Sequence, residues 1–522
     1  MVSCQNYEGG YFGAFGALGK RNDLDAVVHL GDYIYEYGNG VYGIDDPDRY
    51  QAPANEVLTL ADYRTRYSSY RLDLDLRRSH QQHPFITVWY DHESAYDSYK
   101  DGAENHDEGE GSWEVRKAIS KQVYAEWMPI RGEAQSVYRK IQYGDLVDLI
   151  MVDTRIEGRE EQISDVTSPA LYAQDRTLLG QQQKGWLLQQ LATSQAKWKV
   201  IGNQVIFSEF IVGWAGPATG QTPEQVESTF LDIWDGYPIE RLQLMGFMME
   251  NQISNVVWLT GDFHSSFAYD VTPVASPLSM YIAAQIPGFT TPTYDPSTGA
   301  GSIAVEFATP SISSANFDEN IDLVTATGLE QQINTPLPES AGDLAGVNPN
   351  PHMKFVDLVR HGYFILDLTE DKAQADWYFI DDILTRTTSE SLAASWYTNN
   401  GENRLQEASG AAAGKSNPDQ PAPPIFSIPT SSEDEQFATV LSVYPNPASE
   451  LLLANYAINQ KSPVRISLVD LAGKEVAELM EEKVLGVGNY TLTANLDGVN
   501  PGTYLLSFAI GEGQYVRKVM VK

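Results

Sequence analysis

Short apolar runs, each bounded by Gly, Asp or Asn, recur along the first half of the chain and predict buried β-strands. These runs are Asp25–Leu30, Phe85–Trp89, Leu146–Val152, Lys199–Ile201 and Asn255–Leu259. Amphipathic stretches between them predict helices, at Glu114–Trp127, Gln181–Thr193 and Ile239–Ile253. Strands that alternate with helices predict an α/β domain.

The alternation of strands and helices fades after about Ala275. The runs Ser302–Ala308 and Gly362–Leu368 read as further strands without intervening helices. We therefore expect a mixed sheet arrangement in this part of the domain.

The stretch Ala408–Pro424 is dense in Ala, Gly and Pro and poor in aliphatic residues, so it cannot bury a core and predicts a linker. Three later runs alternate apolar with polar residues, and Gly, Asn and Asp turns separate them: Val464–Val469, Tyr490–Ala494 and Thr503–Ala509. Several short strands in so little chain predict a compact β-sandwich. The expected organisation is a catalytic domain at 1–407, a flexible linker at 408–432 and a β-domain at 433–522.

Composition limits the classes of function. Acidic residues outnumber basic ones 70 to 35 in the 522-residue chain, which gives a formal charge of −35. Such a field repels nucleic-acid backbones, so we expect no specific nucleic-acid binding. It suits a solvated acidic surface or a protein that attracts divalent cations. No apolar run approaches the roughly 20 residues that span a bilayer. The N-terminus lacks the regions of a signal peptide, and we expect that an upstream segment precedes Met1.

Three clusters of polar residues follow predicted strands, at Gly31–Glu36, Trp89–Glu93 and Thr260–His264. Each one alone is also compatible with an ordinary turn at the end of a strand. In the first, an Asp and a Tyr three residues later offer oxygen ligands that suit hard cations, and ferric ion accepts phenolate. In the last, Asp262 and His264 share a face because alternate residues of an extended chain do so.

The three clusters together predict a site with more than one metal ion. Carboxylates that converge at one site raise each other's pKa unless cations stabilise them. Ligands in open α/β sheets bind at the carboxyl ends of the strands, where all three clusters lie. Cys4, the single cysteine, excludes an intramolecular disulfide and offers a thiolate, which is a strong ligand for iron or zinc.

The order of seven short motifs resembles PhoD-type alkaline phosphatases and phosphodiesterases, within the calcineurin-like metallophosphoesterase superfamily. The motifs are SCQN at the start, GDYIYE, W-x-DHE, DTR at Asp153–Arg155, GNQ at Gly202–Gln204, WDGYP at Trp234–Pro238 and GDFH. The resemblance covers residues 3 to about 407. It implies an α/β fold with a double mixed β-sheet flanked by helices, a cofactor of Fe³⁺ with Ca²⁺, and hydrolysis of phosphate mono- and diesters. A dinuclear Zn²⁺ or Mn²⁺ site is the alternative.

The resemblance also implies roles for individual residues. Cys4 and Tyr35 resemble the iron ligands, and Asp32 resembles the residue that bridges the metals. The other residues that resemble metal ligands are Asp91, Asn203, Asp262 and His264. His92 resembles the catalytic histidine. Arg155 either holds the phosphate oxygens in a bidentate manner or forms a structural salt bridge.

This chain departs from the family in two places. The family's N-terminal β-domain and signal peptide are not in the sequence, so we expect almost no strand before Cys4. Tyr90 stands where an Asp is common in the W-x-DHE run, which changes the charge around the predicted ligands.

The C-terminal region resembles the sorting domain of the type IX secretion system. The resemblance covers about Phe437 to Lys522 and rests on Val443–Ala448, Leu468–Lys474, Pro501–Tyr504 and the final VRKVMVK. It implies a Bacteroidota-like source, recognition by the type IX machinery, and a secreted or outer-membrane-associated protein. An adhesion-type β-sandwich is the alternative.

The sequence therefore predicts a metal-dependent phosphoric ester hydrolase that releases phosphate outside the cell. Two metal ions would clamp the ester oxygens and activate a water, and His92 would protonate the leaving alkoxide. One alternative is a phosphodiesterase that acts mainly on lipids or polymers. Another is a surface binding protein that has lost catalysis.

Overall fold

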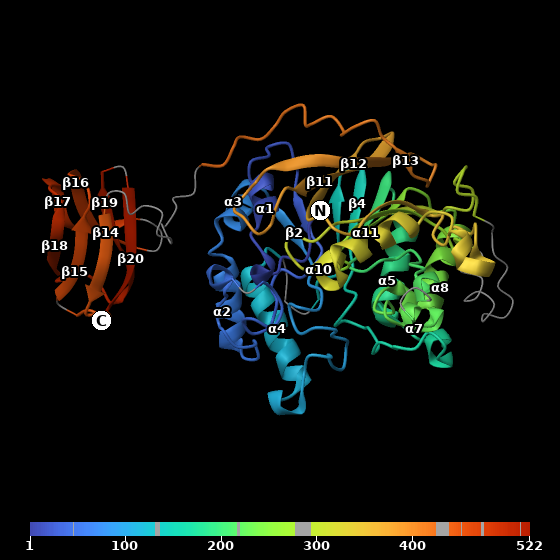
Figure 1. The fold of residues 1–522 in the computed structure, drawn as a ribbon, viewed down its shortest axis with the longest axis horizontal. Helices are drawn as coiled ribbons and strands as arrows, with labels where there is room; N and C mark the ends of the chain where they lie inside the picture. The colour runs from blue at the N-terminus through green and yellow to red at the C-terminus, as the bar shows by residue number, and fades with distance from the viewer. Residues whose placement is uncertain are drawn as a thin grey trace. The chain divides into compact units, whose positions relative to one another are not determined.

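The computed structural model describes residues 1–44, 46–130, 136–216, 220–276, 294–423, 438–449, 451–470, 474–511 and 513–522. The chain divides into two compact units, Met1–Pro423 and Pro424–Lys522 (Figure 1). No helix among the described residues is long and apolar enough to cross a bilayer.

The centre of the first unit is a seven-stranded mixed sheet in the order β3-β4-β5-β6-β8-β7-β9. Its strands are β3 (Arg139–Tyr143), β4 (Val147–Met151), β5 (Trp198–Gly202), β6 (Val256–Thr260), β7 (Ser266–Val271), β8 (Ala304–Ala308) and β9 (Met353–Asp357). Strands β4, β5, β6 and β8 are parallel. Strand β3 pairs antiparallel with β4, and β7 pairs antiparallel with β8 and β9. The expected mixed arrangement is thus confirmed.

A second layer of strands faces this sheet. It consists of the parallel pair β1 (Val27–His29) and β2 (Phe85–Thr87), and of β10 (Gly362–Leu368), β11 (Lys372–Ile380), β12 (Glu390–Asn399) and β13 (Gln406–Glu407), which pair antiparallel. The first two residues join these groups. The Val2 amide donates to the Val28 carbonyl at 3.0 Å, and the Met1 amino group donates to the Phe364 carbonyl at 2.7 Å.

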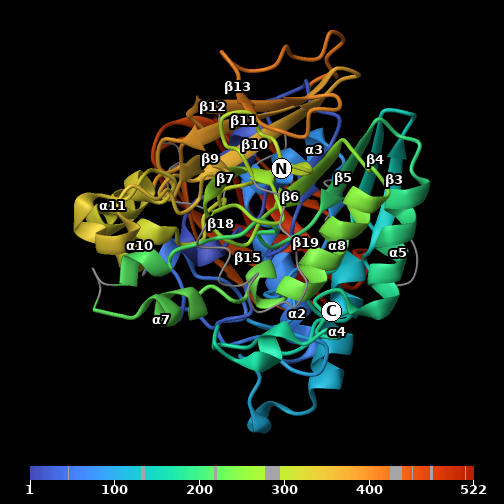
Figure 2. The same ribbon diagram turned by 90° about the vertical axis from the view of Figure 1, so that its right-hand side faces the viewer.

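Alternating side chains of the large sheet fill two cores. Leu149 and Met151 of β4 face the second layer of strands, whereas Ile150 faces the other way and packs with Leu187 and Leu244. The latter two lie on α5 (Gly180–Thr193) and α8 (Pro238–Glu250), which cover that face (Figure 2).

Helices also flank the second layer of strands. They are α1 (Gly13–Leu18), α2 (Leu60–Tyr70), α3 (Leu74–Gln82) and α4 (Trp113–Trp127). The remaining helices are α7 (Pro223–Ser228), α10 (Phe317–Ile321) and α11 (Leu323–Gln332). Two strand layers with helices on both outer sides are the predicted double β-sheet.

Part of the predicted linker belongs to the first unit and is hydrogen-bonded to its strands and loops. The Gly410 carbonyl accepts a hydrogen bond from Gln374 at 2.9 Å, the Ala412 amide donates to Asp376 at 2.8 Å, and Asp419 donates its amide to the Asn22 carbonyl at 2.7 Å. The composition correctly indicates that this segment buries little side-chain surface, but its backbone groups form hydrogen bonds with the preceding part of the chain. Residues 408–423 thus belong to the first unit, whereas 424–432 lie outside the described residues, so a flexible linker at 408–432 stays a prediction.

The second unit is a β-sandwich, as predicted. One sheet contains β14 (Ala438–Tyr444), β15 (Leu451–Ile458) and β18 (Gly488–Asn495), and the other contains β17 (Glu475–Leu485), β16 (Ser462–Val469), β19 (Gly502–Ile510) and β20 (Gly513–Val521). Leu452 and Tyr456 of the first sheet pack in one core with Ile466 and Phe508 of the second.

The contacts of residues 408–423 lead to a prediction about truncation. A protein that ends at Pro423 should keep the folding stability of the first unit, whereas one that ends at Glu407 should lose at least about 1–3 kcal/mol, because the hydrogen bonds that residues 408–423 form with the rest of the unit disappear. Denaturant unfolding of the two purified fragments measures the difference. Equal midpoints, or an unfolded 1–423 fragment, would contradict it.

Candidate metal centre

The three predicted polar clusters meet in one cavity of about 630 Å³. Asp32 follows β1, Asp91 follows β2 and Asp262 follows β6, and all three line this cavity together with His92 and His264. The carboxyl ends of these strands thus bring side chains that are far apart in the sequence to a single site.

Asp32 lies at the centre of the potential ligands. Its carboxylate belongs to two sets of donor atoms, and within each set all atoms lie within 4.8 Å of one another. The first set adds Cys4 and His264, and the second adds Asp91 and His92. Its Oδ2 accepts from the Cys4 thiol at 3.4 Å. Its Oδ1 is buried, and no group of the described residues hydrogen-bonds to it. A carboxylate oxygen that is desolvated and unpaired fits a position where a cation binds.

Burial and nearby negative charges disfavour the charged forms of Asp32, Asp262 and Cys4. Burial and the charge of Asp91 raise the pKa of Asp32 well above its usual range, and burial raises the pKa of Asp262 to about 7. Burial together with the two carboxylates also raises the pKa of Cys4. A bound cation reverses these shifts because it stabilises carboxylates and a thiolate. The donor set therefore fits metal ions.

The backbone is strained at four of the predicted ligands. Cys4, Asp32, Asp262 and His264 have φ angles of 58°, 60°, 61° and 56°. This left-handed conformation costs a non-glycine residue about 1–2 kcal/mol. Such strain persists only where the surrounding structure enforces it, and it is concentrated at functional sites.

The GDY and DHE motifs interlock to hold this conformation. Gly31 has φ of 108°, and a Cβ atom there would lie 2.3 Å from the Cβ of Tyr90. The buried Glu93 carboxylate accepts the backbone amides of Asp32 at 3.0 Å, Tyr33 at 2.7 Å and Tyr90 at 2.8 Å. Glu93 therefore fixes the loop that carries Asp32, although it is not one of the predicted ligands.

Cys4 needs only a short strand before it. Val2 forms a parallel bridge with His29, and the Leu30 amide donates to the Val2 carbonyl at 2.9 Å. The Cys4 amide then donates to the Gly31 carbonyl at 3.2 Å. The short pairing expected here is sufficient to place the thiol beside Asp32.

Tyr35 lies on the same side of Asp32 as the thiol. Its hydroxyl is 3.5 Å from Asp32 Oδ2 and accepts a hydrogen bond from Ser314 at 2.6 Å. Burial raises the pKa of this phenol well above its usual range. As with Cys4, only a cation would favour its deprotonated form.

His264 presents an unprotonated nitrogen to the site. Its Nδ1 lies 2.7 Å from the Ala315 carbonyl, which only accepts, so Nδ1 carries the proton. Burial lowers the pKa of His264 to about 4, which keeps the ring neutral and leaves Nε2 with its lone pair. A histidine fixed in this manner is suited to bind a metal.

His92 has the opposite arrangement, because it pairs with a carboxylate. Its Nδ1 lies 2.7 Å from Oε2 of Glu36, and the other Glu36 oxygen accepts from the Tyr96 amide at 2.7 Å and from Asn105 at 2.8 Å. Glu36 is the last residue of the GDYIYE run, but the sequence predicts no role for it.

The charges around His92 keep it protonated. Burial alone would lower the pKa of His92, but the charges of Asp91, Glu36 and Asp32 outweigh burial and raise it to about 10. Burial alone would raise the pKa of Glu36, but the charge and hydrogen bond of His92 lower it to about 2. An imidazolium has no lone pair for a metal, so His92 is suited to donate a proton.

Arg155 is held by carboxylates of the protein. Its guanidinium pairs with Asp232, with Nη1 at 3.0 Å from Oδ1, and its Nη2 lies 3.4 Å from Asp97 and 3.5 Å from Asp91. These contacts favour the structural salt bridge over the grip on phosphate. Asp232 was not predicted, because no strand-like run leads into it.

Asn203 differs from the other predicted ligands. Its Oδ1 accepts from the Trp234 indole at 3.1 Å, and its Nδ2 donates to the Val205 carbonyl. It is not among the residues that line the cavity. Its contacts therefore support a structural role rather than the predicted ligation.

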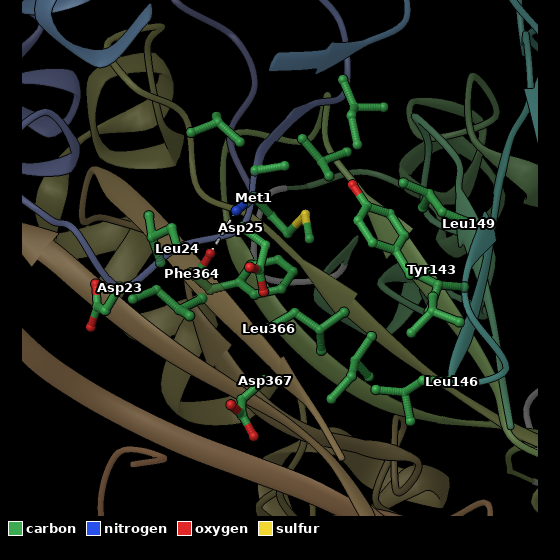
Figure 3. Close-up of a pocket in the computed structure, with 18 of the residues that line it drawn as sticks. Met1, Asp23, Leu24, Asp25, Tyr143, Leu146, Leu149, Phe364, Leu366 and Asp367 are labelled. Atoms are coloured by element: carbon green, nitrogen blue, oxygen red, sulfur yellow. Dashed lines mark hydrogen bonds between the residues drawn. The ribbon is translucent and has the colours of Figure 1, made fainter. Parts of the chain in front are cut away.

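A second cavity of about 270 Å³ lies elsewhere in the first unit and shares no lining residue with the first. Figure 3 shows Met1 and Phe364 within it, with the apolar side chains of Leu146, Leu149 and Leu366. It contains no predicted site residue and plays no part in the chemistry of the centre.

Comparison with known proteins gives matches to both units. A family model described as PhoD-like phosphatase matches residues 1–377, and one described as a secretion system C-terminal sorting domain matches 442–522. Alkaline phosphatase D of Bacillus subtilis (strain 168) is 35% identical over 277 residues, which are 51% of this chain and 46% of that protein. The chain thus spans about half the length of this curated relative.

A solved structure of PhoD matches with a TM-score of 0.61 and 27% identity. The match covers 79% of this chain and 71% of the other. The fold and both family resemblances inferred from the sequence motifs are therefore confirmed.

The pair of His92 and Glu36 leads to a prediction about titration. In metal-free protein, NMR should show His92 titrating near pH 10, far above its ordinary value of 6.5, and Glu36→Gln should lower this pKa because a neighbouring negative charge is removed. The contribution of His92 to stability is fully present below its ordinary value of 6.5 and is lost as pH rises through about 10, whereas that of Glu36 is lost as pH falls through about 2. Glu240→Gln, which removes another buried carboxylate, should leave the titration unchanged. A wild-type His92 that titrates near 6.5 would contradict the account.

Proposed function

Because the chain belongs to the PhoD-like phosphatase family, we propose that it hydrolyses phosphate esters at the centre around Asp32. The observation that carries the proposal is the convergence of buried donor groups on this carboxylate, one oxygen of which has no partner among the described residues. The family match and the likeness to alkaline phosphatase D support the reaction class.

The metals of the proposal are Fe³⁺ with Ca²⁺, as the family resemblance implies, with Zn²⁺ or Mn²⁺ as the alternative. Cys4, Tyr35 and His264 would hold the iron, Asp91 and Asp262 would hold calcium, and Asp32 would bridge the two. The bound ions would supply positive charge for the phosphoryl oxygens and acidify a water to serve as nucleophile.

The residues of the chain supply the remaining steps. The protonated Nε2 of His92 donates a proton to the departing alkoxide, and Glu36 stabilises the imidazolium before the transfer. Arg155 acts through Asp91, since its contact at 3.5 Å helps to fix that carboxylate. The phosphate would therefore be gripped by the metals rather than by this guanidinium.

For the second unit we propose export by the type IX secretion system. The match to a secretion system sorting domain over residues 442–522 and the β-sandwich fold support this proposal. The enzyme would then act at the cell surface or outside the cell.

The proposed function is tested with natively purified protein, its metal content and a substrate panel. Paired monoester and diester chromogenic substrates should both be hydrolysed at alkaline pH, and chelation should abolish the activity. Metal-free protein with full activity, or metal-loaded protein with none, would overturn the proposal.

His92→Ala should lower kcat by about 10²–10⁴-fold, because a proton donor in the transition state contributes that much. Elemental analysis should find the metal content near wild type, because the imidazolium does not ligate. Loss of metal in parallel with loss of activity would instead make His92 a ligand.

Cys4→Ser and Tyr35→Phe test the proposed iron. Thiolate and phenolate donate charge to ferric ion, so the wild type should be coloured and each variant should lose visible absorbance and activity. Tyr33→Phe is the matched control, because its hydroxyl instead contacts His80 at 2.8 Å. A colourless wild type that is fully active with zinc or manganese would contradict the iron assignment.

A further inference from the structure

One side of the catalytic cavity is apolar. Phe230, Phe263 and Phe317 line it, and their ring centroids lie 5.7–6.2 Å apart in all three pairs. Ile321, four residues after Phe317 on α10, lines the same cavity and is 44% exposed. We call these four residues the apolar wall.

The apolar wall packs against the buried core but is itself partly exposed to the cavity. Phe210 is 1% exposed, and its ring contacts Phe230 at 5.3 Å and Phe263 at 4.8 Å. The three rings of the wall are only partly buried. Phe263 lies between Asp262 and His264 in the sequence, so the wall adjoins the residues proposed to bind metal.

The cavity contains little positive charge for a second anionic group. Among its lining residues the cationic side chains are Arg155 and His92, and both are paired with carboxylates. A neighbouring cavity of about 330 Å³ shares Asp97 and Asp232 with it and is also lined by Glu104 and Glu161. An anionic leaving group would therefore meet apolar rings or carboxylates.

From this arrangement we propose that the apolar wall is a leaving-group subsite. It selects phosphate esters whose alcohol carries an uncharged apolar group, such as an alkyl or aryl chain, over esters whose alcohol carries a further negative charge. The inference rests on the proposed function, because it places the phosphate at the centre around Asp32. The favourable binding free energy comes from the burial of the alcohol's apolar chain, which leaves water and packs against the aromatic rings.

The test uses the metal-loaded full chain and three phosphate monoesters below the concentrations at which they aggregate. Ethyl and hexyl phosphate differ in apolar length but little in the acidity of the alcohol, and 6-carboxyhexyl phosphate adds a charge. We expect kcat/KM to rise at least about tenfold from ethyl to hexyl, mainly through KM, since each buried methylene contributes up to about fourfold. The added carboxylate should remove this gain.

Variants connect the preference to the apolar wall. Phe317→Ala and Ile321→Ala should each lower the ratio of kcat/KM for hexyl phosphate to kcat/KM for ethyl phosphate. Ile321 is exposed, so its truncation does not threaten the fold. Leu384→Ala, at another exposed apolar residue that does not line the cavity, is the control and should keep the preference.

The outcomes separate the two proposals. Equal kcat/KM for ethyl and hexyl phosphate, or a preference that survives in both wall variants, would overturn the subsite and leave the hydrolase standing. Faster hydrolysis of the carboxylate-ended ester would also overturn it. Failure to hydrolyse any of the three esters would overturn the proposed function and the subsite together.

Discussion

The first unit is organised around carboxylates that the fold brings together and wholly or partly removes from water. Asp32, Asp91 and Asp262 follow three different strands, and burial with mutual repulsion raises the pKa of Asp32 and Asp262. Such an arrangement is unfavourable unless cations occupy it. The left-handed backbone at Asp32 and the three amides bound by Glu93 show that the fold nevertheless enforces it.

The same constraint explains how an acidic protein would bind phosphate. Arg155 and His92, the positive groups that line the cavity, are paired with Asp232 and Glu36. In the proposed function the attraction for phosphate would come from bound cations, which fits the formal charge of −35. In this proposal the protein itself would hold the metal ligands in place, keep a proton on His92 and provide an apolar wall for the leaving group.

The sequence predicts those features that have a local pattern. Apolar runs with polar residues after them located β1, β2 and β6, and the resemblance to PhoD-type enzymes pointed to Cys4 and Tyr35 beside Asp32. Features made by contacts between distant segments have no such pattern. Glu36 lies 56 positions from His92 and Asp232 lies 77 from Arg155, so neither pair could be recognised from spacing. Composition likewise does not indicate that 408–423 are hydrogen-bonded to the rest of the first unit, because most of these contacts are made by backbone groups.

The central claim is that a cation compensates the buried charge of Asp32, and the melting temperatures of the wild type and Asp32→Asn test it directly. Chelation should lower the melting temperature of the wild type by at least about 3 °C, because a ligand that binds only the folded state is removed. Asp32→Asn should respond little, and in chelator it should melt above the wild type, because the uncompensated charge is gone. A wild type whose melting temperature is unchanged by chelation, while Asp32→Asn melts lower in chelator, would contradict the account.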